Sequence, residues 1–108
     1  MHIRIYWGKV AGHAWPSIEQ RYRELMEVPV DGLLGRFVTQ DVNDQESMFT
    51  ITFWKDIKSI RAWEASPNYA NLYLAAVSPY IAGEMAVSLC EVKVFESARL
   101  VHALSNAS

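Results

Sequence analysis

The sequence predicts an α+β domain with a ferredoxin-like β-α-β-β-α-β order and an antiparallel sheet. Three observations lead to this prediction. Segments that alternate every second residue flank segments with helical spacing, a short polar turn joins the two middle strands, and no linker or repeat interrupts the order. The length of 108 residues suits one core. We assign the domain to residues 1–96 and treat residues 97–108 as a C-terminal tail.

The first predicted strand and helix occupy the N-terminal third of the chain. The strand "HIRIYWGKV" alternates, so that one face carries Ile3, Ile5 and Trp7 and the other carries His2, Arg4 and Tyr6. Gly12 ends it. A helix is expected to begin at Pro16 or Ser17, because proline suits the first helical turn, and to end before Pro29.

The middle of the chain predicts a β-hairpin. The second strand follows a turn at Asp31-Gly32, and Gly35 within it indicates a bulge or a close backbone approach. The polar segment 43–46 is expected to form the turn of the hairpin. The third strand, "SMFTITFW", alternates clearly over residues 47–54.

The second helix is expected to begin after Asp56, which can cap it. Because Pro67 disfavours helical geometry at Ser66, we expect a break there, and Pro79 and Gly83 should end the second segment. A fourth strand follows over residues 85–96. The tail is open to three interpretations: a short helix, an arm onto a partner, or disorder.

The third strand carries bulky apolar side chains on both faces, with Phe49, Ile51 and Phe53 opposite Met48 and Trp54. The helices of this topology cover only one face of the sheet. A second copy packing sheet to sheet would cover the other, so the sequence predicts a homodimer.

Composition excludes several function classes. A net charge of −2 offers no basic surface for nucleic acid, and no apolar run is long enough to span a membrane. A single cysteine, Cys90, rules out an internal disulfide, and we expect a cytoplasmic protein. The three histidines are far apart and have no metal-ligand spacing, so no metal site is predicted.

The concentration of aromatic residues is the remaining signal, with four Trp and five Tyr in this short chain. Trp63, Tyr69 and Tyr73 fall on the second helix, and Trp7 and Trp54 fall on strands. Aromatic residues at helical spacing usually belong to the core. Trp and Tyr also carry polar tips that need partners, which favours a pocket wall at "RAWEASPNYANLY".

The segment from "GLLGRFVTQDV" through "FTITFWKD" to "W-x-x-S-P-x-Y" resembles the antibiotic-biosynthesis monooxygenase family, and the resemblance covers about residues 1–96. It implies a dimeric α/β barrel, in which two protomers pair their sheets and each keeps a pocket between helices and sheet. Some members oxidise aromatic polyketides to quinones with O2 and with no cofactor or metal. Trp63 and Tyr69 match their substrate-contacting Trp and Tyr in type and spacing.

A second branch of the family degrades haem with an Asn on the first strand and a proximal His on the second helix. The resemblance places those two positions on Trp7 and Tyr73, and both replacements remove groups that the chemistry requires. Tyrosine can ligate haem iron, so haem remains an alternative cofactor.

The resulting hypothesis is a cofactor-free monooxygenase that acts on a small electron-rich aromatic molecule. Trp63 and Tyr69 are the expected catalytic residues, and Trp7, Tyr73 and His13 are expected to bind the substrate. The alternatives are a haem-binding or haem-degrading monooxygenase and a non-catalytic dimeric protein that binds a small molecule. A dry aromatic core is the further alternative.

Overall fold

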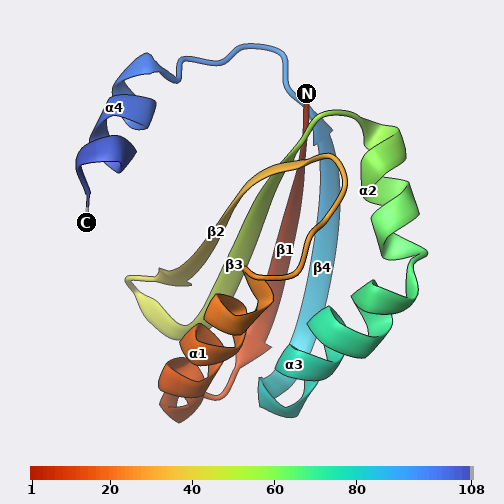
Figure 1. Cartoon of the computed structure of the whole chain (residues 1–108). Coiled ribbons are helices and arrows are strands. Elements are labelled where there is room, and N and C mark those ends of the chain that lie inside the picture. The colour runs from red at the N-terminus through yellow and green to blue at the C-terminus, as the bar shows by residue number, and fades with distance from the viewer. Residues whose placement is uncertain (108) are drawn as a thin grey trace.

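The computed structural model describes residues 1–107. In this part of the chain, four strands form one antiparallel sheet in the order β2-β3-β1-β4 (Figure 1). The strands are β1 (His2–Val10), β2 (Leu33–Asp41), β3 (Asp44–Trp54) and β4 (Ile81–Glu91). The helices are α1 (Trp15–Leu25), α2 (Ile57–Glu64), α3 (Ala75–Val77) and α4 (Ala98–Asn106). The α+β ferredoxin-like class predicted from the sequence is therefore confirmed.

Helix α1 follows β1 after a short helical turn, Gly12–Ala14. Pro16 stands in its first turn, where a missing amide hydrogen costs no hydrogen bond. The helix ends at Leu25, several residues before Pro29, and its turn closes through hydrogen bonds from the Met26 amide to carbonyls of the last turn. Ile18 and Leu25 are buried on its inner face. The amphipathic pattern therefore predicts the helix but not its last residue.

The β2–β3 hairpin is tighter than the sequence predicts. Its turn is Val42–Asn43, because β3 begins at Asp44 rather than at residue 47. The Asp41 carboxylate accepts a hydrogen bond from the Asn43 amide at 2.7 Å, which fixes the turn locally. The bulge predicted at Gly35 is confirmed by a register shift between Leu33 and Gly35.

Helix α2 has the predicted cap, since the Asp56 carboxylate accepts a hydrogen bond from the Ser59 amide at 2.7 Å. Hydrogen bonding to Ser59 lowers the pKa of this carboxyl group below its usual value. The helix ends at Glu64. Helical structure resumes at Pro67, and a π-helical segment, Tyr69–Leu74, then leads into α3. The predicted break at Ser66-Pro67 is thus present.

Strand β4 occupies Ile81–Glu91 instead of residues 85–96, so the predicted limits were wrong at both ends. Pairing explains the difference. β4 runs alongside β1 from Val10 opposite Ile81 to His2 opposite Glu91, and the length of β1 therefore sets the length of β4. Gly83 lies inside this strand and does not end a helix.

The helices α1, α2 and α3 lie on one side of the sheet (Figure 1). The sheet presents to them the side chains Arg4, Tyr6, Val10, Met48 and Trp54, all buried. Two clusters of buried residues form the core on this side, one under α1 and one under α2 and the π-helical segment.

The opposite face of the sheet carries an apolar surface without a covering helix. The register places on it Ile3, Ile5, Trp7, Phe37, Phe49, Ile51 and Phe53. All of them are half-buried, and Phe37 and Phe53 meet edge to face with centroids 5.8 Å apart. This surface agrees with the prediction that the third strand carries apolar side chains on both faces, and the homodimer itself stays a prediction.

The C-terminal segment forms helix α4, which stands apart from the sheet and from the other helices (Figure 1). All of its residues are exposed. Of the three interpretations left open by the sequence, a short helix is therefore the one the structure supports. No helix within residues 1–107 is long and apolar enough to cross a membrane.

Candidate functional site

An aromatic cluster lies where α2 and the π-helical segment meet the sheet. The ring centroid of Trp63 is 4.6 Å from that of Tyr69, 5.2 Å from that of Tyr73 and 5.3 Å from that of Trp54. The contacts with Tyr69 and Tyr73 are edge to face, a favourable geometry for aromatic rings. The cluster therefore brings together the two residues predicted as catalytic and one predicted to bind substrate.

The break at Ser66-Pro67 makes this arrangement possible. On a continuous α-helix, residues six apart do not share a face, so Trp63 and Tyr69 would not meet. Here the Ser66 hydroxyl donates to the Trp63 carbonyl at 2.6 Å and accepts from the Tyr69 amide at 3.3 Å. Ser66 thus fixes the path of the backbone between the two rings, as expected for local hydrogen bonding at a helix break.

Arg4 of β1 lies against this cluster and is almost completely buried. Its Nε donates to the Glu64 carboxylate at 2.9 Å, and its Nη2 donates to the Tyr69 hydroxyl, also at 2.9 Å. The guanidinium carbon is 5.1 Å from the ring centroid of Trp63 and 5.4 Å from that of Tyr69. Since the Tyr69 oxygen accepts from Arg4, its own proton is free to be donated to a ligand.

A small inner cavity of about 30 Å³ lies between this cluster and the sheet. It is lined from the sheet by Arg4, Tyr6, Arg36, Thr50 and Thr52, and from the helices by Tyr22, Trp63, Tyr69, Tyr73, Leu74 and Val77. A volume of this size holds about one water molecule or one oxygen-bearing group, and an aromatic ring does not fit.

Three polar atoms around the inner cavity are buried and have no hydrogen-bond partner within residues 1–107. They are the indole Nε1 of Trp63, the hydroxyl of Tyr73 and Nη2 of Arg36. A buried donor without a partner costs about 1–3 kcal/mol, so such groups are uncommon and cluster at functional sites. All three can donate, and the set is therefore complementary to a hydrogen-bond acceptor.

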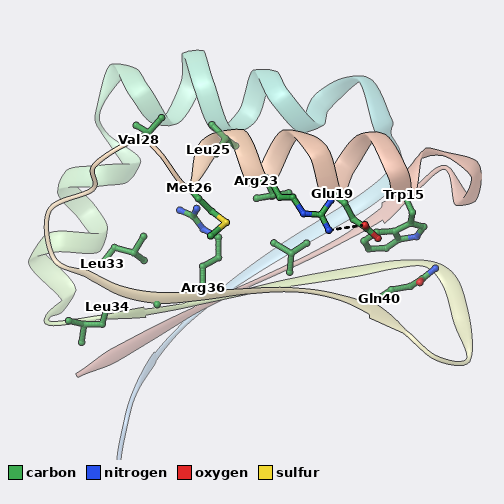
Figure 2. A pocket seen from close by; sticks show the side chains of 13 residues that line it. Trp15, Glu19, Arg23, Leu25, Met26, Val28, Leu33, Leu34, Arg36 and Gln40 are labelled. Carbon is green, nitrogen blue, oxygen red and sulfur yellow. Dashed lines mark hydrogen bonds and ion pairs between the residues drawn. The ribbon is translucent and has the colours of Figure 1, made fainter. Parts of the chain in front are cut away.

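A larger groove of about 650 Å³ opens between α1 and β2 (Figure 2). Figure 2 shows Arg36 rising from β2 toward α1, and both Arg36 and Met26 line the groove. On the helix side, Arg23 and Glu19 form an ion pair of 3.5 Å across the exposed edge of the groove. The groove is large enough for a fused aromatic ring system. It is lined by Trp15, Glu19, Tyr22, Arg23, Leu25, Met26, Val28, Leu33, Leu34, Gly35, Arg36, Val38 and Gln40.

Tyr22 and Arg36 line both the groove and the inner cavity, so they form the boundary between the two spaces. The Tyr22 hydroxyl lies 3.4 Å from the Thr50 hydroxyl. Burial raises the pKa of Tyr22 above its ordinary value, and the hydroxyl therefore stays protonated at neutral pH. Arg36 lies over the ring of Tyr73, with its guanidinium carbon 4.9 Å from the centroid.

Two of the residues predicted to bind substrate lie elsewhere. Trp7 is on the helix-free face of the sheet, opposite Phe49 and Ala86, and its indole donates to the Ser47 hydroxyl at 3.3 Å. Arg4 and Tyr6 take the positions on β1 that face the helices. His13 is exposed in the turn before α1 and lines neither the groove nor the inner cavity. The structure thus separates Trp7 and His13 from the aromatic cluster.

Sequence reasoning missed the charged and hydroxyl groups of the site. Arg4 appears in the alternation of β1 as a polar residue beside Tyr6, and nothing in its own segment reveals Glu64, sixty positions away. Arg36 and Tyr22 stand on the predicted second strand and first helix without a motif. A search of residues 1–107 finds no group of three His, Cys, Asp or Glu side chains placed to bind a metal ion.

The model of the antibiotic biosynthesis monooxygenase family matches residues 11–73, more than half of the chain. The resemblance found in the sequence is thereby confirmed. A comparison with curated protein sequences gives no significant match.

Solved structures with the same fold include a candidate antibiotic biosynthesis monooxygenase from Nitrosomonas europaea, with 14% identity, a TM-score of 0.70 and coverage of 87% of this chain and 100% of that one. A second, from Bordetella bronchiseptica, has 13% identity and a TM-score of 0.74, with coverage of 87% and 97%. A variant of MhuD with two manganese protoporphyrin IX molecules per active site has 22% identity and a TM-score of 0.68, with coverage of 89% and 98%. At these identities the likeness shows a shared fold alone.

Proposed function

Because this chain belongs to the antibiotic biosynthesis monooxygenase family, we propose that it oxidises a small electron-rich aromatic molecule with O2 and without a cofactor. The observation that carries the proposal is the junction of two spaces: a groove wide enough for a ring system and a small inner cavity surrounded by hydrogen-bond donors. The ring would lie in the groove, and one oxygen-bearing group of the substrate would enter the inner cavity.

The proposed reaction needs no external reductant. When a phenol is oxidised to a quinone by O2, one oxygen atom enters the ring, the other leaves as water, and the substrate supplies all the electrons. The protein then has to bind the ring, stabilise the negative charge that develops on the phenolic oxygen and exclude water. Donors fixed by a folded scaffold are suited to that task, because they do not reorganise as charge develops.

The residues of the cluster have separate proposed roles. Tyr69, oriented by Arg4, would donate its hydroxyl proton to a substrate oxygen. Trp63 would form the wall of the inner cavity and donate from its indole nitrogen, and Tyr73 would donate from its buried hydroxyl. Trp7 and His13 have no part in this proposal, since they line neither space.

Haem does not fit the residues that surround this site. Tyr73 would be the axial ligand, but its hydroxyl faces a cavity of about 30 Å³ and Arg36 covers its ring. In the groove, Tyr22 is the tyrosine that would have to bind the iron, and the raised pKa of its buried hydroxyl disfavours the phenolate form that does so. We therefore derive no step through haem.

Oxygen uptake by the purified protein tests the proposal. The substrates would be naphthols, dihydroxynaphthalenes and anthrone, with quinone formation followed by absorbance. We expect uptake with at least one of them, and a loss of about 100-fold in kcat for Tyr69→Phe if its hydroxyl stabilises the developing charge. Tyr80→Phe is the matched control, because Tyr80 lines neither the groove nor the inner cavity.

Three other outcomes would contradict the proposal. Full turnover by Tyr69→Phe would remove that residue from the mechanism. Tight binding of a phenol without oxygen uptake would indicate a non-catalytic binding protein. Haemin that shifts its Soret band on binding, and bleaches when ascorbate is added in air, would indicate haem degradation instead.

A further inference from the structure

Arg36 is a half-buried cation without a countercharge among residues 1–107. Within residues 1–107 its guanidinium takes part in none of the ion pairs, which join Arg4, Lys9, Arg21, Arg23 and Lys93 to carboxylates. Its Nη2 is completely buried and unpartnered. Its guanidinium carbon lies 4.9 Å from the ring centroid of Tyr73, which is a cation–π contact. A cation–π contact contributes about 1 kcal/mol and leaves the buried Nη2 without a hydrogen-bond acceptor.

Arg4 lines the same inner cavity and shows the contrast. It has Glu64 for its charge and the Tyr69 hydroxyl for a second donor. Within residues 1–107 the fold therefore gives one of two neighbouring arginines a carboxylate partner and two hydrogen bonds, and gives the other neither. A conformation that leaves such a group unsatisfied is stable only if the rest of the fold fixes it, and such positions are typical of ligand sites.

The groups beside Arg36 restrict which kind of ligand can bind to its guanidinium. Arg36 and the indole of Trp63 can only donate, and Tyr73 can donate as well. Among the residues that line the adjoining groove, two are arginines, Arg23 and Arg36, and one is a carboxylate, Glu19, which leaves a net charge of +1. Donors and charge together favour an anionic acceptor.

We propose that the substrate is an aromatic acid, and that its carboxylate, not its reacting phenolic oxygen, is the group that enters the inner cavity, where Arg36, Trp63 and Tyr73 bind it. The Tyr69 hydroxyl is then the donor that remains for the phenolic oxygen. This inference rests on the proposed function and names the substrate class of the same site. A carboxylate is ionised at neutral pH, whereas a phenol with a pKa of about 10 is not, so a carboxylate binds Arg36 without a cost of ionisation. The planar fork of arginine also matches a carboxylate better than it matches a single oxygen.

The test uses two probes that differ only in the group of interest, 2-naphthoate and 2-naphthol. Their affinities for the full chain are measured by isothermal titration calorimetry at neutral pH. We expect 2-naphthoate to bind about 10-fold more tightly than 2-naphthol. In Arg36→Met the affinity for 2-naphthoate should fall about 10- to 100-fold, as expected for one charge-assisted hydrogen bond, and the affinity for 2-naphthol should stay within about 3-fold.

Two further variants separate a specific effect from a structural one. Arg36→Lys keeps the charge without the fork and should recover part of the preference for 2-naphthoate. Arg21→Met removes an arginine of α1 that lines neither the groove nor the inner cavity and should leave both affinities unchanged. Equal affinity of the wild type for both probes, absence of 2-naphthoate binding, or a preference that survives Arg36→Met would each overturn the inference.

The calorimetric result does not depend on turnover. Preference for 2-naphthoate with no oxygen uptake from any hydroxylated naphthoic acid would retain the anion site and refute the monooxygenase function. Oxygen uptake from neutral naphthols as fast as from their carboxylated counterparts would retain the function and refute the anion site.

Discussion

Two arginines that face the same cavity should respond in opposite ways to the same replacement. Arg4→Met removes the bond to Glu64 and the bond to Tyr69, which are worth about 2 and about 1 kcal/mol, and two cation–π contacts worth about 1 kcal/mol together. Removing a buried charge returns about 2 kcal/mol of desolvation. Glu64 stays 30% exposed and can be hydrated once Arg4 is gone. We therefore expect Arg4→Met to lower the free energy of unfolding by about 2 kcal/mol.

Among residues 1–107, Arg36 has no ion-pair partner and no hydrogen-bond partner for Arg36→Met to remove. The replacement loses the contact with the ring of Tyr73, about 1 kcal/mol, and relieves a buried unpartnered donor that costs about 2 kcal/mol. We expect this variant to be about 1 kcal/mol more stable than the wild type. The two variants should then differ by about 3 kcal/mol, or by about 13 °C in Tm for a domain of this size.

Urea unfolding followed by Trp fluorescence measures the difference, at one protein concentration for all variants so that association affects each equally. Equal destabilisation by both replacements would refute the reasoning, because it would mean that Arg36 has a stabilising partner in solution. A ligand that binds Arg36 should stabilise the wild type and leave Arg36→Met unaffected. With such a ligand present, the wild type should therefore be the more stable of these two proteins.

Three further predictions concern the hydroxyl at the boundary, the helix-free face and one turn. Burial raises the folded-state pKa of Tyr22 above its ordinary value of 10.0, so the contribution of the protonated hydroxyl to stability is complete below pH 10 and is lost as the pH rises toward the folded-state pKa. Tyr22→Phe should therefore flatten the decline of the unfolding free energy above pH 10. An unchanged decline would show that Tyr22 ionises freely. Ile51→Asp places a charge in the centre of the helix-free face and should convert a homodimer into a monomer, as measured by sedimentation velocity, and an unchanged dimer would place the interface elsewhere. Gly32 has φ = +82°, and a Cβ there would collide with Ser59; Gly32→Ala should lower the unfolding free energy by about 2 kcal/mol or more in urea titrations, and a neutral effect would contradict that backbone geometry.

Local signals in the sequence were sufficient for the fold. Asp56 caps α2 through a bond to an amide three residues later, Gly35 marks a bulge within its own strand, and Pro67 interrupts the helix at its own position. Each of these effects acts over a few residues, so a single sequence reveals it. The limits of β4 were wrong because they depend on β1, which lies far away in the chain.

The aromatic part of the site was also predictable, because Trp63, Tyr69 and Tyr73 belong to one stretch of chain and the break at Ser66 indicates an altered relation between them. The polar part was not. The partner of Arg4 is Glu64, which lies on another element. Whether Arg36 has a hydrogen-bond partner depends on the side chains that surround it from the helices and the sheet. Such relations exist only in the tertiary structure.

The position of Trp7 shows what alternation alone leaves undetermined. A period of two divides β1 into two sets of side chains but does not say which set faces the helices, and Trp7 was the residue of its set expected to bind substrate. The fold turns that set to the helix-free face and buries Arg4 under the helices. In a β2-β3-β1-β4 sheet β1 is a central strand, so a charged residue that faces the helices from it is buried and requires a partner. An arginine between two isoleucines on a predicted central strand is thus a stronger indication of a polar site than any aromatic residue on the same strand.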